Sequence, residues 1–285
     1  MKLLATKHLE QAGCSHPDPP KVAAEILVIS IQILLLINSV ALIVILMLLQ
    51  YNKTMSKLHL HIANANQTFT DAEIAIFKNT AQQAETFVSS EFAQFDYEVD
   101  VIITTPSFML PTIAEDGIAG KTLHSRLIMI SVDKSQHGVS EDFIFETICH
   151  EMSHSLRWEK LPEYAETMFD GMILEGLAVA LEEEAIIKLR RRNQQFFLRE
   201  MQKTSQAEID KIIAALQGNF KDKIYDYTKI FFTGDDILPR WAGYKLGYYF
   251  VKQYLHQTVR LLHRRLWQVT RILSYKIEES PSRYA

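Results

Sequence analysis

The residues best suited to chemistry lie in one short stretch, His150–His154, which has the pattern HExxH. Residues four apart lie on one face of an α-helix, so the imidazoles of His150 and His154 can bind a single Zn²⁺ at about 2.0–2.1 Å per bond. Glu151 lies beside the first histidine, where its carboxylate can act on a water molecule without binding the metal. The pattern therefore predicts a metal-assisted hydrolytic site with Glu151 as general base.

The surrounding sequence favours the helix that this geometry requires. Ser140 can cap a helix whose first turn contains Glu141 and Asp142, two acids that suit the positive end of the helix dipole. No Pro or Gly interrupts residues 141–160. Apolar residues spaced four apart give a separate packing face: Ile144, Ile148 and Met152. We therefore expect one helix over 141–160 whose metal-binding face differs from its packing face.

A third ligand is expected, because a catalytic zinc ion usually has three protein ligands and one water. Glu175 follows His154 by 21 positions and lies in a predicted helix over 164–192. Its flanking residues are apolar: Ile173, Leu174, Leu177 and Val179. A carboxylate buried among them is costly without a partner, and Zn²⁺ would be that partner. Glu175 is thus the predicted third ligand.

Other residues near these predicted ligands are expected to serve packing or to face solvent, and not to bind the metal. Gly176 and Ala178 are expected to let the helix of Glu175 approach the HExxH helix closely. The run Glu182–Glu184 is expected to form a solvated helix face. Cys149 should point away from the metal, as a buried thiol and not a ligand.

A tyrosine-rich segment near the C-terminus has two interpretations. Gly243 and Gly247, four apart, would let their helix pack closely on another, and Tyr244 and Tyr248 lie on the same stripe. Aromatic core packing is the favoured interpretation. In the other, Tyr244 or Tyr248 donates a hydrogen bond to the oxyanion of a tetrahedral intermediate.

Composition sets the limits for these assignments. The chain has 285 residues, 48% of them hydrophobic and 22% charged, with a formal net charge of −4. This charge gives no reason to expect nucleic acid as a partner. The two cysteines, Cys14 and Cys149, exclude a disulfide framework.

The N-terminal part differs in character from the rest. Residues 26–49 contain no charged side chain, and about 20 apolar residues span a bilayer, so we expect one transmembrane helix there. Residues 1–25 would be a flexible tail and 50–65 a linker. Three lysines precede the span and two follow it, which leaves the side of the membrane open. Translation from Met55 would give a product without the span.

Residues 66–285 are expected to form one α+β domain, mostly helical with a small sheet. The capping pair Thr70 and Glu73 predicts a helix that runs to about 95. Strands are expected over 97–104 and 127–132, with a loop over 106–121 between them. The helices over 141–160 and 164–192 follow. Further helices are expected after Ser205, over 221–232, and from Pro239 to about 274.

Three motifs of the sequence together resemble those of a known family: His150-Glu-x-x-His154, Glu175-Gly-Leu-Ala178 and Gly243-Tyr-Lys-Leu-Gly-Tyr248. HExxH followed about twenty residues later by a helical Glu is similar to the gluzincin zinc metallopeptidases. The full combination, over roughly residues 60–275, resembles the bacterial domain-of-unknown-function family of predicted zinc-dependent proteases.

The resemblance implies that His150, His154 and Glu175 bind zinc, that Glu151 is the catalytic base and that the strand over 127–132 lines the cleft. One position departs from the gluzincin pattern. Those enzymes carry an Asp four residues after the ligand Glu, to orient the first His, whereas this chain has Val179. Asp170 is the expected substitute.

The sequence therefore predicts a membrane-anchored zinc peptidase that acts on a peptide or protein substrate. A non-catalytic, membrane-anchored zinc protein with a regulatory or binding role is the alternative. An ordinary helical domain in which HExxH occurs by chance is the third hypothesis.

Overall fold

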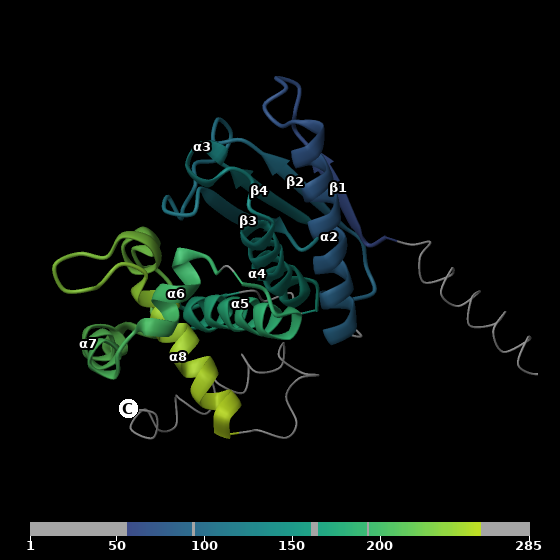
Figure 1. Cartoon of the computed structure of the whole chain (residues 1–285). Helices are drawn as coiled ribbons and strands as arrows, with labels where there is room; N and C mark the ends of the chain where they lie inside the picture. Colours follow the sequence, from purple (N-terminus) through teal and green to yellow (C-terminus); the bar gives the residue numbers. More distant parts are fainter. Residues whose placement is uncertain (1–55, 93–94, 161–164, 193, 258–285) are drawn as a thin grey trace, which may run out of the picture. The chain divides into compact units, whose positions relative to one another are not determined.

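The computed structural model describes residues 56–92, 95–160, 165–192 and 194–257 (Figure 1). All described residues belong to one compact unit, which begins at Ser56. The expected tail, the expected membrane span over 26–49 and the end of the last expected helix lie outside them. Within the described part, no helix is both long and apolar enough to cross a bilayer.

A mixed sheet of four strands forms one layer of the described unit. Its order is β1 (Leu58–Ile62), β2 (Val99–Thr104), β4 (Leu127–Val132) and β3 (Ile118–His124). β1, β2 and β4 run parallel, and β3 pairs with β4 in the antiparallel sense.

Two of these strands were predicted and two were not. β2 and β4 lie where the β-branched runs predicted strands. β1 lies inside the expected linker over 50–65, and β3 begins inside the loop expected over 106–121. β3 was missed because its sequence, IAGKTLH, contains Gly and several polar residues and lacks a strand-like hydrophobic alternation.

Helices form the rest of the unit: α2 (Asp71–Glu91), α3 (Lys134–His137), α4 (Glu141–Lys160), α5 (Met168–Leu189), α6 (Phe196–Lys203), α7 (Gln206–Leu216) and α8 (Ala242–Gln257). Short 3₁₀ and π-helical turns occupy Gln217–Asn219 and Lys229–Thr233. The expected α+β class, mostly helical with a small sheet, is confirmed for the described part.

The predicted starts of α2, α4 and α7 were accurate, whereas α5 occupies only Met168–Leu189 of the expected 164–192 and α2 ends at Glu91 and not near 95. The capping box of Thr70 and Glu73 starts α2, and α4 begins and ends at the predicted residues. The helix expected over 221–232 is reduced to the π-helix. The helix expected from Pro239 begins only at Ala242, because Trp241 has a left-handed φ of 62°.

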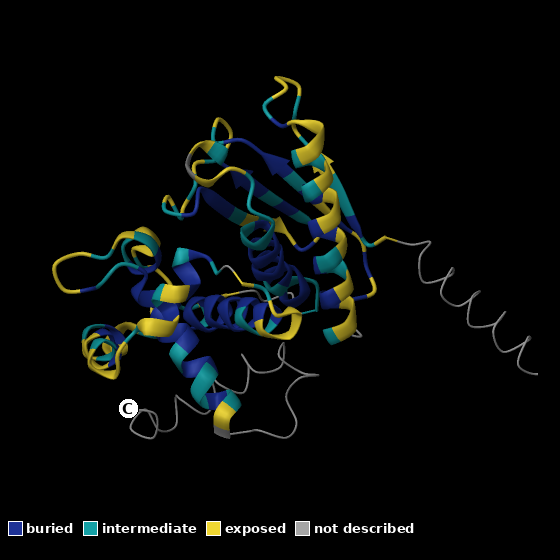
Figure 2. Ribbon diagram, viewed as in Figure 1, coloured by how far each residue is buried: buried dark blue, intermediate teal, exposed yellow. Residues whose placement is uncertain are grey.

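α4 and α5 form the centre of the structure. α4 packs against α2, α5 and the strand β3, and α5 packs against α4 and α8. Most residues of both helices are buried, as Figure 2 shows. The HExxH helix is therefore held between the sheet on one side and α5 on the other.

α5 and α8 cross at two glycines, and this contact is unusually close (Figure 1). A Cβ atom added to Gly247 would lie 1.8 Å from the carbonyl oxygen of Met172. One added to Gly176 would lie 2.2 Å from the backbone carbon of Gly247. The close packing predicted for Gly247 is thus found. The expectation for Gly176 was wrong in its partner, because this glycine admits α8 and not α4.

We expect Gly247→Ala to destabilise the protein, because its Cβ can be accommodated only by separating two buried helix backbones. Overpacking of this kind costs about 3 kcal/mol in the free energy of unfolding. Urea unfolding followed by circular dichroism measures the change. Gly218→Ala is the matched control, since an added Cβ there meets no atom within 4 Å. Equal midpoints for the two variants would contradict the assignment.

Candidate metal centre

The two helices α4 and α5 bring the three predicted ligands together. Nε2 of His150 lies 3.2 Å from Oε2 of Glu175, and Nε2 of His154 lies 3.3 Å from the same oxygen. All three side chains are buried, and one donor atom from each lies within 4.8 Å of the others. The face of α4 that carries both histidines therefore meets Glu175 in the interior.

The spacing of these donors fits a zinc ion. In a tetrahedral site with metal–ligand bonds of about 2.0–2.1 Å, neighbouring donor atoms are about 3.3 Å apart. The two measured separations are 3.2 and 3.3 Å. Two imidazole nitrogens and one carboxylate oxygen are also a donor set that catalytic zinc sites use. The residues present can therefore hold this metal.

The pKa shifts of the buried ligands also indicate that the centre favours a positive charge. Burial opposes the ionised form of Glu175, but His154 and His150 outweigh it and hold the pKa of this carboxyl well below its usual range. Burial likewise opposes the charged form of His150, yet the carboxylates of Glu182 and Glu175 raise its pKa well above its ordinary value. The buried acids thus require positive charge among the imidazoles.

Glu151 is held by the edge strand β3. Thr122 donates from Oγ1 to Oε2 of Glu151 at 2.7 Å and to its backbone carbonyl at 3.0 Å. A Cβ added to Gly120 would lie 2.5 Å from Oε1 of Glu151, so a larger residue there would displace the carboxylate from its present position. The strand beside the site is therefore β3, and the expectation that residues 127–132 line the cleft was wrong.

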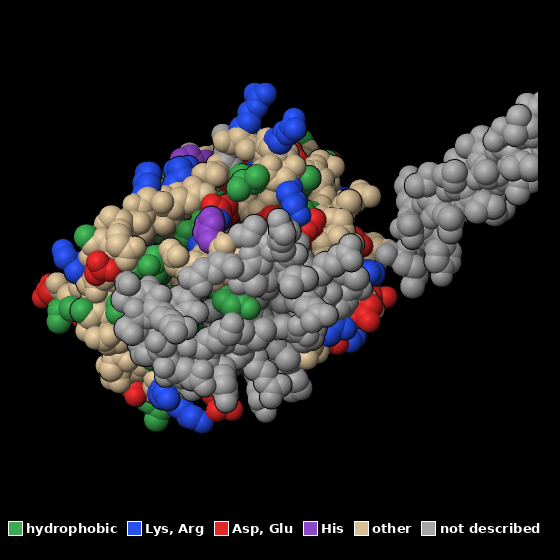
Figure 3. Space-filling view, turned by 90° about the horizontal axis from the view of Figure 1, so that it is seen from below, with side chains coloured by type: hydrophobic (Ala, Val, Ile, Leu, Met, Phe, Trp, Pro, Cys, Tyr) green, Lys and Arg blue, Asp and Glu red, His purple; other side chains and the backbone are tan. Residues whose placement is uncertain are grey.

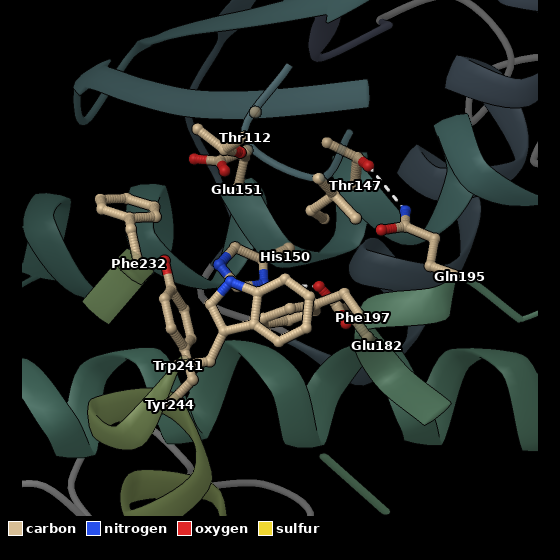
Figure 4. Close-up of a pocket in the computed structure, with 12 residues that line it drawn as sticks. Thr112, Thr147, His150, Glu151, Glu182, Gln195, Phe197, Phe232, Trp241 and Tyr244 are labelled. Atoms are coloured by element: carbon tan, nitrogen blue, oxygen red, sulfur yellow. Dashed lines mark hydrogen bonds and ion pairs between the residues drawn. The ribbon is translucent and has the colours of Figure 1, made fainter. Parts of the chain in front are cut away.

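A pocket opens next to His150 and Glu151. The pocket comprises about 420 Å³ of empty space, a volume that includes open solvent at its mouth. Figure 4 shows His150 between Glu151 and a group of aromatic side chains. The remaining lining residues are Thr112, Ile113, Gly120, Thr147, Glu182, Gln195, Phe197, Phe232, Trp241 and Tyr244. Acid–base groups and an apolar wall thus face one space.

Glu182 contradicts the expected solvated face. Its exposed fraction is only 2%, and Nδ1 of His150 donates to its Oε1 at 2.5 Å. Glu183 and Glu184 follow the expectation better, since they pair with Lys252 and Lys188 respectively.

Asp170 is not the acceptor for the first histidine that we expected. It closes the capping box of α5 by accepting from Thr167. Val179, four residues after Glu175, is fully buried and apolar. The carboxylate that contacts His150 from behind comes from Glu182 instead, which the sequence interpretation missed.

Of the two candidate tyrosines, Tyr244 lines the pocket and Tyr248 does not. Tyr244 lines the pocket, and its ring centroid lies 6.3 Å from that of His150. Burial and the charge of Glu175 raise the pKa of Tyr244 well above its ordinary value, so its hydroxyl keeps its proton. Tyr248 instead lies near Glu183 and Lys252, outside the residues that line the pocket.

Tyr227 is a further neighbour that the sequence did not reveal. Its hydroxyl donates to Oε1 of Glu175 at 3.1 Å, and its ring stacks on Phe231 at 4.5 Å between centroids. No periodic pattern identified it, because it lies in a single helical turn directly before the π-helix and not on one face of a long helix.

Two further side chains of α4 with titratable groups are fully buried, the thiol of Cys149 and the carboxyl of Glu146. Cys149 is fully buried, as predicted, and burial raises the pKa of its thiol. Burial and the nearby Glu182 raise the pKa of Glu146 to about 9, so this side chain is neutral at pH 7. The backbone N–H of Gln195 donates to the Glu146 carboxyl at 3.0 Å.

Charge on the surface is mixed. On the face in Figure 3, Lys and Arg side chains are interspersed with Asp and Glu over the described part.

Comparison with known proteins places this geometry in a family. Neither the curated proteins nor the solved structures gave a significant match. A family model described as "Predicted Zn-dependent protease (DUF2268)" matches residues 77–269 and so covers α4, α5 and α8. It includes every residue of the metal centre described above, and the match spans most of the chain. The chain belongs to this family of predicted zinc-dependent proteases.

Proposed function

We propose that this protein is a zinc-dependent peptidase of gluzincin type whose ligands are His150, His154 and Glu175. The observation that carries the proposal is the convergence of two Nε2 atoms on one buried Glu oxygen at 3.2 and 3.3 Å. The family description supports zinc and proteolysis. Glu151 beside the same pocket supports hydrolysis over storage or a purely structural metal.

In the proposed reaction each residue has a distinct task. A bound zinc ion would supply Lewis acidity, which polarises the scissile carbonyl and acidifies water. Glu151 takes a proton from the attacking water and later returns it to the leaving amine. Thr122 orients the Glu151 carboxylate, and the protonated hydroxyl of Tyr244 is a donor for the developing oxyanion.

The proposed substrate is an extended peptide segment. β3 is an edge strand of the described sheet and holds Glu151 through Thr122. Edge strands bind extended peptides through backbone hydrogen bonds. The aromatic wall of Phe197, Trp241 and Tyr244 would receive an apolar side chain of that peptide.

We expect Glu151→Gln to keep zinc and to lose peptide hydrolysis by about 10²–10⁴-fold, because the amide cannot accept the proton of water. The rate on a fluorogenic peptide library, with zinc content measured on the same sample, tests this. Glu159→Gln, on the same helix but paired with Arg126, is the control. Cleavage by Glu151→Gln near the parent rate would remove Glu151 from the mechanism. A zinc-loaded parent without activity would favour a non-catalytic zinc protein.

Single Ala variants of His150, His154 and Glu175 should lose bound zinc and activity together, since two remaining donors hold the metal weakly. Mass spectrometry of the metal after dialysis gives the zinc content per chain. His124→Ala, which removes an exposed histidine, should keep the parent content. Stoichiometric zinc in all three ligand variants would refute the assignment.

We also propose that residues 26–49 anchor the protein in a lipid bilayer by one pass. Full-length protein should sediment with membranes and be released by detergent but not by high salt, because apolar length and not charge holds it. Deletion of residues 26–49 should move the protein to the supernatant. Recovery of the intact chain in the supernatant after high-speed centrifugation would count against the anchor.

A further inference from the structure

Glu175 and Glu182 contact the two ring nitrogens of one imidazole. Oε2 of Glu175 lies 3.2 Å from Nε2 of His150, and Oε1 of Glu182 lies 2.5 Å from Nδ1. Both acids lie on α5 and are seven residues apart, two turns on the same face of the helix. His150 is therefore held at both ring nitrogens by one helix.

We propose that Glu182 is the positioning residue for the metal centre. By accepting the Nδ1 hydrogen of His150, it leaves Nε2 as the nitrogen that gives up its hydrogen to bind the metal, and it fixes the plane of the ring. The proposal rests on the proposed function for its metal. In gluzincins an Asp four residues after the ligand Glu orients the first His. This chain has Val179 at that position, and we assign the role to Glu182, seven residues after Glu175.

Helix geometry explains why position +7 can replace position +4. At about 100° per residue, position +4 is rotated about 40° from Glu175 and position +7 about 20° in the opposite sense. Glu182 is therefore closer to the line of Glu175 than Val179 is. Val179 is fully buried in the core, so the +4 position contributes packing only.

Burial indicates that the contact with His150 is the reason for an acid at this position. Glu182 has an exposed fraction of 2%, and its Oε2 atom has no hydrogen-bond partner among the described residues. A carboxylate in such a place is costly unless it is paired. No lysine or arginine forms an ion pair with it in the described part of the chain, whereas the next two acids each pair with a lysine. His150 is the group that compensates it.

The contact predicts a specific loss when the acceptor is removed. Without Glu182 the imidazole of His150 can rotate and can place its hydrogen on either nitrogen. Partners of this kind are typically worth 10–100-fold in metal affinity. Glu182→Ala should therefore raise the zinc dissociation constant by about 10–100-fold, and Glu182→Gln, whose amide oxygen still accepts, should raise it less.

The test uses the full-length protein in detergent and measures zinc affinity by competition with a chromophoric chelator. Glu182→Ala, Glu182→Gln and the matched control Glu183→Gln are compared with the parent, and Co²⁺-loaded samples give the visible spectrum of the site. We expect weaker binding in the order parent, Gln, Ala, an altered Co²⁺ spectrum for Ala, and parent behaviour for Glu183→Gln. Circular dichroism shows whether each variant is folded. If Glu182→Ala does not fold, the comparison of Glu182→Gln with the parent is the test.

The outcomes separate this inference from the proposed function. Parent-like zinc affinity in folded Glu182→Ala, or in Glu182→Gln where Ala unfolds, would overturn the role of Glu182 and leave the ligand assignment intact. A drop of equal size in Glu183→Gln would also overturn it, because the effect would then be nonspecific. A parent protein that binds no zinc would overturn the proposed function and this inference with it.

Discussion

The contact between one buried carboxylate and two imidazole nitrogens constrains the rest of the structure. Glu175 sits in an apolar helix, and its charge is tolerated only where His150 and His154 face it. That requirement fixes the rotation of α5 about its axis relative to α4. Once the rotation is set, the neighbouring face of α5, about 100° round the helix axis from Glu175, packs against α8 and presents Gly176 to it.

The sequence predicted the groups whose signals are local. The HExxH spacing, the acids at the start of α4 and the absence of Pro and Gly were sufficient to give that helix its limits. Glu175 was found because an acid among apolar neighbours is conspicuous. Its role could be predicted before any contact was known, since burial of a charge has few physical explanations.

Residues whose roles depend on tertiary contacts were missed. Glu182 looked like one acid in a run of three, and only its separation of seven from Glu175 distinguished it from its neighbours. The start of β3 fell in the loop expected over 106–121 and its end received no assignment, because Gly120 and Thr122 contact the Glu151 side chain and not a hydrophobic face. Tyr227 contacts Glu175 from a short helical turn directly before the π-helix. In each case the constraint comes from an atom distant in the chain, which no periodic pattern records.

The glycine crossing of α5 and α8 has a consequence for how such a chain can diverge. Gly176 directly follows Glu175, and Gly247 lies three residues after Tyr244, so the crossing sets the pocket wall in register with the ligand. The segment between α7 and α8 supplies Tyr227, Phe232 and Trp241 to the site, but Ile224 and Ile237 along it are largely exposed. Insertions beside these two exposed residues would leave the crossing unchanged, whereas a shift of α8 by one residue would move Tyr244 away from His150. The exposed turns of this segment can therefore vary in length, while the crossing cannot.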